Sequence, residues 1–192
     1  MAVDRRKQIV EAAGKSFALF GYKATTMEQV AKLANVGKGT IYTFFTNKEE
    51  LFDVIVDDVI YQLRDLAKTS IDPDQSFMNN LHRFLFSALE FRREHEFVIR
   101  LTHEVKEMGT AAAKEGMLKI ENAILNFMAV KIQDAIDRED IKPCNPERTA
   151  FAMFKMYIAF VFDWELTHEP LSKQEILELF RQYFVNGLAV ES

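Results

Sequence analysis

The sequence contains few residues of the kinds that cross-link a chain, interrupt helices or span membranes. Cys144 is the single cysteine among 192 residues, so an internal disulfide and a cysteine-rich metal site are excluded. No run of about 18 uncharged apolar residues occurs, so we expect no membrane span. The first residues include basic side chains but no apolar segment with a small-residue cleavage site. We therefore expect a cytoplasmic protein.

Strand patterns and catalytic motifs are also missing. No run of alternating β-branched residues occurs, and the 7 glycines and 4 prolines lie mostly at the ends of segments with helical periodicity. The four histidines show no HExxH spacing, and neither a Gly-rich phosphate loop nor a Gly-x-Ser-x-Gly turn is present. We therefore expect an all-α protein that is not an enzyme and uses no metal and no cofactor.

The net charge of −5 conceals an uneven distribution. Residues 1–48 carry +5 and residues 49–192 carry −10. A basic end on an acidic body is typical of a protein that contacts nucleic-acid phosphates with one end only. Chance asymmetry between solvated surfaces is the alternative interpretation.

The segment from Thr25 to Phe52, TTMEQVAKLANVGKGTIYTFFTNKEELF, has the pattern of a helix-turn-helix. Two capping threonines precede apolar residues that recur at helical spacing from Met27 to Ala34. Asn35-Val36-Gly37 then breaks this helix, because Asn and Gly tolerate the left-handed backbone of a sharp turn. Residues 38–44 form a second, short helix, which in such motifs lies in the DNA major groove.

The same segment closely resembles the TetR family of transcriptional repressors. The matching elements are the opening TT, the VAKLANVGKGTIY core, the FF and the NKEEL that begins the next helix. The resemblance is specific for roughly the first 50 residues. It implies a nine-helix architecture, with a three-helix head for DNA and six helices for effector binding and dimerisation.

Periodicity along the chain also gives nine helices. They are expected at about 4–20, 27–34, 38–44, 47–68, 75–93, 95–108, 117–138, 147–166 and 173–188. The stretch 109–116 is ambiguous, because glycines flank an alanine-rich sequence. We predict a DNA-binding domain over residues 1–48, a ligand-binding and dimerisation domain over residues 49–192, and the helix at 47–68 as their connector.

The second helix of the motif carries most of the candidates for DNA contact. They are Gly37, Lys38, Gly39, Thr40, Tyr42, Thr43 and Lys48. The two lysines can bind phosphate, the glycines admit a close backbone approach, the threonines can meet base edges, and the phenol can donate to phosphate. Solvated lysines and a packing tyrosine are the alternatives, whereas Ile41 and Phe45 are expected in the core.

The resemblance adds one pair of candidates and one departure. It implies that Thr25 or Thr26, together with Lys38, Thr40, Tyr42 and Lys48, occupies positions that contact the operator. Phe44 stands where many family members have Tyr or His, which can bond a phosphate. Phe44 cannot make that contact.

The remainder of the chain is rich in phenylalanine and methionine, which suit a pocket for an apolar or flat ligand. The candidate lining residues are Phe84, Phe91, Phe97, Leu101, Phe127, Phe154, Met156 and Tyr157. His103 and Glu104 are candidates for the polar end of such a pocket. Ordinary core packing is the alternative for each aromatic residue.

The stretch from Ala150 to Trp164 is apolar on nearly every side, so it requires burial on every side. We expect one face in the core and another in a homodimer interface, which the helix carrying Ile176 to Leu188 completes. The sequence thus predicts a homodimeric, ligand-responsive transcriptional regulator: a repressor that a hydrophobic small molecule releases from operator DNA. A helical dimeric interaction module without sequence-specific DNA binding is the alternative.

Overall fold

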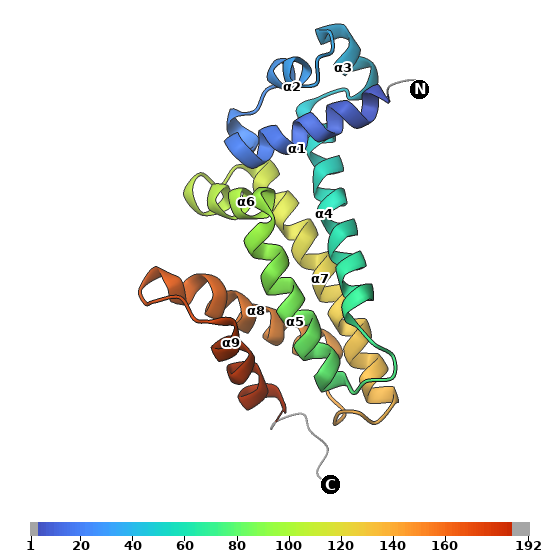
Figure 1. Cartoon of the computed structure of the whole chain (residues 1–192), viewed down its shortest axis with the longest axis vertical. Helices are drawn as coiled ribbons and strands as arrows, with labels where there is room; N and C mark the ends of the chain where they lie inside the picture. Colours follow the sequence, from blue (N-terminus) through green and yellow to red (C-terminus); the bar gives the residue numbers. More distant parts are fainter. Residues whose placement is uncertain (1–3, 186–192) are drawn as a thin grey trace. The chain divides into compact units, whose positions relative to one another are not determined.

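The computed structural model describes residues 4–185, except for the side chains at positions 78, 82, 85, 89, 92–94, 162, 173 and 185. Within that range the chain forms nine α-helices and no strand (Figure 1). The helices are α1 (Arg5–Ala24), α2 (Met27–Leu33), α3 (Lys38–Phe44), α4 (Lys48–Ser70), α5 (Phe77–Glu94), α6 (Glu96–Glu107), α7 (Ala111–Asp137), α8 (Pro146–Ile158) and α9 (Lys173–Phe180). The all-α, nine-helix prediction is confirmed.

Four boundaries differ from the predictions. Helix α1 continues past residue 20 to Ala24, with a kink at Gly21. Helix α7 begins at Ala111, so it includes most of the ambiguous stretch. Helix α8 ends at Ile158 and continues as a π-helical stretch, Ala159–Asp163, and a 3₁₀ turn, Trp164–Leu166. Helix α9 likewise passes into a π-helical stretch, Arg181–Val185, and the predicted interface residue Leu188 lies outside the described residues.

The chain divides into two compact units, each with its own core. The first unit contains residues 4–62 and 91–121, and the second contains residues 63–90 and 122–185. The first unit therefore holds the helix-turn-helix together with α6 and the beginning of α7. Helices α4, α5 and α7 each contribute residues to both units.

Helix α1 packs on α2 and on α6 within the first unit, with α6 on one side of α1 and the helix-turn-helix on the other (Figure 1). Its inward face carries the buried residues Ile9, Ala13 and Phe17. Gly21 interrupts the helix with φ 78°, a left-handed conformation that glycine adopts without steric cost. The kink lies directly after residue 20, where the sequence predicted the end of the helix, but the α6 contact was not predicted.

The carboxylate of Glu104 on α6 binds the backbone at this break. Its Oε2 accepts from the Tyr22 amide at 2.6 Å, and its Oε1 accepts from the Lys23 amide at 3.0 Å and from the Thr110 hydroxyl at 3.2 Å. Glu104 is only 4% exposed. A buried carboxylate is tolerated because these donors replace its lost hydration. A Cβ on Gly21 would lie 2.4 Å from Oε2, so a side chain there would obstruct the contact.

Aromatic rings fill the space beside this junction. Phe52 of α4 meets Phe17, Tyr22 and Phe97 at ring-centroid distances of 5.2, 4.9 and 5.7 Å. Gly116 of α7 faces the same ring, since a Cβ there would approach Phe52 to 2.8 Å. Residue 116 therefore belongs to a helix that packs closely on α4, which explains why the stretch before Met117 is helical.

The core of the second unit draws on α5, α7, α8 and α9. Its buried members include Phe77, Ile132, Met153, Ile176 and Phe180. Among the described residues, no helix has the length and hydropathy needed to cross a bilayer. The same residues contain no cluster of three or more His, Cys, Asp or Glu side chains suited to a metal ion.

The Glu104 contact predicts a selective loss of stability. Glu104→Gln keeps the shape but replaces one of two accepting oxygens with an amide donor, which leaves a buried N–H unpaired. Because hydrogen bonds to charged groups contribute about 1.5–3 kcal/mol each, we expect the free energy of unfolding in urea to fall by roughly 2–4 kcal/mol. Glu107→Gln, on the exposed end of α6, is the control and should change it by less than about 0.5 kcal/mol. Equal effects of the two variants would contradict the assigned role.

Candidate nucleic-acid interface and ligand pocket

Helix α2 and the turn after it are fixed by local contacts. Thr26 caps α2 through a reciprocal pair of bonds with Gln29, in which each side chain accepts from the other residue's amide, at 3.2 and 2.9 Å. Asn35 adopts φ 52° in the turn, the left-handed conformation that its sequence position predicts. Helix α3 starts after Gly37 and turns Ile41 inward, and Phe45 follows it into the core. The predicted burial of Ile41 and Phe45 is confirmed.

The outer face of α3 is exposed and carries mixed chemistry. Tyr42 is 43% exposed and Phe44 is 39% exposed. Thr43 is exposed too, and its hydroxyl donates to the Thr40 carbonyl at 2.7 Å, so its methyl and an oxygen lone pair remain for a partner. A Cβ on Gly39 would meet nothing within 4 Å. The surface at Gly39 is therefore open to a close approach by a duplex.

Lys38, at the first position of α3, pairs with an acid on α2. Its ammonium lies 2.7 Å from the Glu28 carboxylate, and both groups are exposed. The bond from Lys38 lowers the pKa of Glu28, and the bond to Glu28 raises the pKa of Lys38. Both groups are thus charged at neutral pH. A phosphate that binds Lys38 has to compete with Glu28.

Lys48 holds the junction between α1 and α2. Its ammonium donates to the carbonyls of Tyr22 and Thr25 at 2.9 and 3.0 Å, and it lies 4.1 Å from the centre of the Tyr22 ring. An ammonium has three donors, so one remains for a phosphate. The Tyr22 phenol donates to Glu49 in turn. Burial and this bond raise the pKa of Tyr22, so the phenol keeps its proton.

The two capping threonines lie in different environments. Thr25 is fully buried, and its hydroxyl shares a hydrogen bond of 3.1 Å with Ser16. Thr26 is exposed at the start of α2. Of this pair, only the Thr26 side chain faces solvent.

The predicted pocket residues are distributed over the two units. Phe97 and Leu101 are buried in the first unit, and Phe91 pairs with His95 there at 4.8 Å between ring centroids. The other candidates belong to the second unit, where Phe154, Met156 and Tyr157 pack against the core. Only Phe84 and Phe127 among the eight line the pocket found in that unit.

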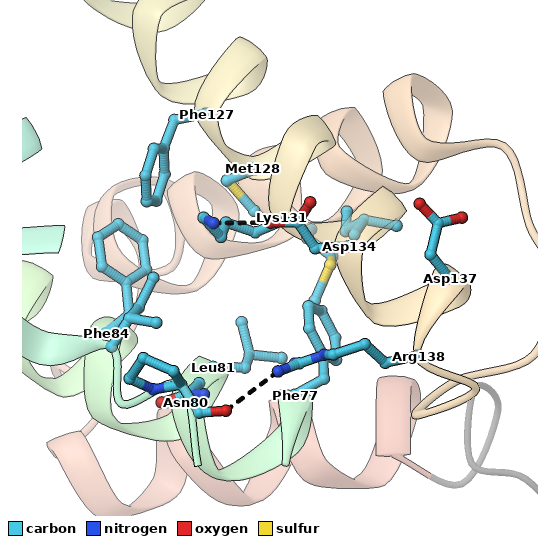
Figure 2. Close-up of a pocket in the computed structure, with 14 residues that line it drawn as sticks. Phe77, Asn80, Leu81, Phe84, Phe127, Met128, Lys131, Asp134, Asp137 and Arg138 are labelled. Atoms are coloured by element: carbon cyan, nitrogen blue, oxygen red, sulfur yellow. Dashed lines mark hydrogen bonds and ion pairs between the residues drawn. The ribbon is translucent and has the colours of Figure 1, made fainter. Parts of the chain in front are cut away.

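That pocket has a volume of about 430 Å³ and lies among the α4–α5 connection, α5, α7 and α8 (Figure 2). Its apolar lining residues are Ile71, Pro73, Phe77, Leu81, Phe84, Phe127, Met128, Ile132 and Met153, and its polar ones are Asn80, Lys131, Asp134, Asp137 and Arg138. The Phe84 and Phe127 rings stand 6.0 Å apart at an angle of 45°. This size and composition suit a small amphipathic molecule.

Two functional features escaped the sequence prediction. Glu104 is not the polar end of a pocket, because both its oxygens bind donors at the α1 break and at Thr110, and His103 is exposed. The cations Lys131 and Arg138 look like solvated charges in the sequence, yet both line the pocket. Lys131 lies on α7 and Arg138 directly follows its end. Within the predicted helix, 117–138, their spacing of seven residues places them on one face, and this was the available signal.

Comparisons with known proteins agree with this geometry. Residues 9–55 match the family model for bacterial regulatory proteins of the tetR family. The chain is 52% identical over 189 residues to YhgD of Bacillus subtilis (strain 168), an uncharacterised HTH-type transcriptional regulator, and the match covers 98% of this chain and 99% of YhgD.

Solved structures share the fold at low sequence identity. A TetR-family regulator from Syntrophomonas wolfei is 18% identical with a TM-score of 0.78, and all of both chains is covered. SmeT in its complex with triclosan is 18% identical with a TM-score of 0.76, over 98% of this chain and 93% of SmeT. Because the motif, the fold and a full-length relative agree, this chain belongs to the TetR family of helix-turn-helix transcriptional regulators, which are DNA-binding proteins and not enzymes.

Proposed function

We propose that this regulator is a homodimeric repressor that a small, largely apolar molecule releases from its operator. The exposed outer face of α3 is the main support for DNA binding, because its side chains and the open surface at Gly39 suit contact with a major groove. Repression follows when the operator overlaps a promoter. Contact with DNA requires a cytoplasmic location.

The contacts divide into two kinds. Lys38, Tyr42, Lys48 and the exposed Thr26 bind phosphates, which fixes the position of the protein on DNA but carries little sequence information. Thr40 and Thr43 meet base edges or thymine methyl groups, which read the sequence. The backbone at Gly37 and Gly39 approaches the duplex closely.

An apolar face of α8 supports the homodimer. Ala150 and Met153 point into the core of their unit, whereas Phe151 on the opposite side of the helix is 52% exposed. Tyr183, beyond α9, is exposed as well. A second copy that packs α8 and α9 against the same helices buries these rings and brings two α3 helices to one two-fold operator.

The pocket of the second unit is the proposed effector site. SmeT, which shares this fold, forms a complex with triclosan, and this supports a small, largely apolar molecule as the ligand of a protein with this fold. A ligand that binds the DNA-free form 100-fold more tightly supplies about 2.7 kcal/mol per site toward release. An interaction module without sequence-specific DNA binding is not favoured, because the helix-turn-helix is complete.

Substitutions can separate contacts that read the base sequence from contacts that position the protein on the DNA backbone. Thr40→Val replaces the hydroxyl with a methyl group and should reduce discrimination between operator and scrambled DNA by about 1–3 kcal/mol if a base contact of the hydroxyl is lost. Tyr42→Phe removes a phosphate contact and should weaken both DNAs by a similar factor. Fluorescence anisotropy titrations at one salt concentration measure both. Full discrimination by Thr40→Val would mean that Thr40 does not read the operator.

The pairing of Lys38 with Glu28 predicts a gain of affinity. Glu28→Gln frees the Lys38 ammonium and removes a negative charge beside the duplex, so operator affinity should rise about three- to tenfold at low salt. Glu11→Gln makes the same charge change on α1, where Glu11 lies 3.9 Å from Lys7, and serves as the control. Equal gains for the two variants would contradict competition between Glu28 and phosphate.

Introducing one charged side chain by substitution tests the proposed dimer interface. Light scattering after size exclusion should give the wild type twice the 22.2 kDa mass of one chain. Phe151→Glu buries an unpaired carboxylate at the interface and should give a monomer with weak operator binding. Val130→Glu, on an exposed position of α7 outside α8 and α9, should remain a dimer. A monomeric wild type at micromolar concentration, or a dimeric Phe151→Glu, would overturn this interface.

A further inference from the structure

The pocket of the second unit is lined by charged side chains as well as by apolar ones, so its lining indicates the chemical class of its ligand. We propose that this pocket binds an amphipathic organic anion, with its apolar part among the aromatic side chains and its acidic group on Lys131 and Arg138. The inference rests on the proposed effector role of this pocket and names the class of molecule that occupies it.

The apolar part of the pocket is built from adaptable side chains. Phe77, Met128 and Met153 are buried at its base, and the half-buried rings of Phe84 and Phe127 face one another at its side. Methionine adjusts its shape around a guest, and tilted rings admit either a chain or a flat group. A chain of about eight carbons or a two-ring aromatic system fits in a volume of about 430 Å³.

Unused hydrogen-bond donors define the polar part. The Lys131 ammonium uses one of its three donors on Asp134 at 2.7 Å. The Arg138 guanidinium donates to the Pro73 carbonyl at 3.2 Å and pairs with Asp140 at 2.8 Å, so three of its five donors remain. Figure 2 shows the Lys131 amine turned toward the side of the pocket that holds Phe84 and Phe127.

The remaining polar groups of the lining are already engaged. The Asn80 side-chain amide donates to the carbonyls of Asp72 and Gln75 and accepts from the Asp72 N–H. These bonds hold the α4–α5 connection in place. Asp137 accepts from Gln133 at 2.7 Å, and Asp134 accepts from Lys131. Position therefore favours an anion: Figure 2 shows the Lys131 amine on the side of Phe84 and Phe127 and the Asp137 carboxylate on the opposite side of the pocket. An anion gains charge-assisted hydrogen bonds, which are about twice as strong as neutral ones.

Three ligands with the same alkyl chain test this assignment. Octanoate, octanol and octylamine are titrated into the DNA-free dimer by calorimetry at pH 7, below their micelle concentrations. We expect octanoate to bind at least tenfold more tightly than octanol, and octylamine to bind most weakly. Equal affinities, tightest binding of octylamine, or no octanoate binding at millimolar concentration would overturn the proposal.

Four variants assign the selectivity to named groups. Lys131→Met keeps the apolar stem but leaves only Arg138 for the carboxylate, so octanoate affinity should fall at least threefold while octanol affinity stays within twofold. Asp134→Asn frees the Lys131 ammonium and should strengthen octanoate binding. Leu81→Trp partly fills the pocket and should weaken both ligands. Lys68→Met, which changes an exposed lysine of α4 outside the pocket, should change neither affinity. An octanoate affinity that Lys131→Met leaves unchanged would contradict the assignment.

A DNA-release assay separates this inference from the proposed function. If octanoate binds through Lys131 but leaves the operator complex intact, the ligand class stands and the effector role of the pocket fails. If octanol releases the operator while octanoate does not bind, the effector role stands and the anion assignment fails.

Discussion

A buried carboxylate, Glu104, fixes the point at which the DNA-binding helices leave α1. Removing a charge from water costs several kcal/mol unless donors replace the hydration, and two backbone amides and a hydroxyl do so here. The arrangement depends on Gly21, because its positive φ exposes the amides of Tyr22 and Lys23 and its missing Cβ leaves room for the carboxylate. Lys48 binds the carbonyls of the same junction from α4. The amides of this segment therefore bind Glu104, and its carbonyls bind Lys48.

The helix-turn-helix is not a separate unit of this chain. The first unit contains α6 and the start of α7 in addition to the helix-turn-helix, so α3 shares a compact unit with helices outside the DNA-binding motif. Helices α4, α5 and α7 continue into the second unit, which contains the proposed ligand pocket. Glu104 joins α6 directly to the backbone that leads into the helix-turn-helix. Rigid elements of this kind are what a ligand has to bias in order to change DNA affinity.

Local signals in the sequence predicted the DNA-binding motif, and nonlocal contacts explain what they missed. Capping by Thr26, the turn at Asn35 and the burial of Ile41 each depend on residues within a few positions. Glu104 instead binds amides 81 and 82 residues away, and backbone donors leave no trace in a sequence pattern. The sequence also could not separate phenylalanines that pack in a core from those that line a pocket. Phe97 packs in the core of the first unit, whereas Phe84 lines a pocket in the second. Apolar composition predicts that a side chain is buried but not which surface buries it.

We propose that a two-fold dimer places two α3 helices in successive major grooves of one operator. Hydroxyl-radical footprinting on a genomic fragment selected by the purified protein tests this arrangement most directly. Such a dimer predicts two protected clusters related by two-fold symmetry, with centres about 34–36 Å apart along the duplex or a multiple of that distance. A single asymmetric protected patch, or selection that enriches no common sequence, would contradict it.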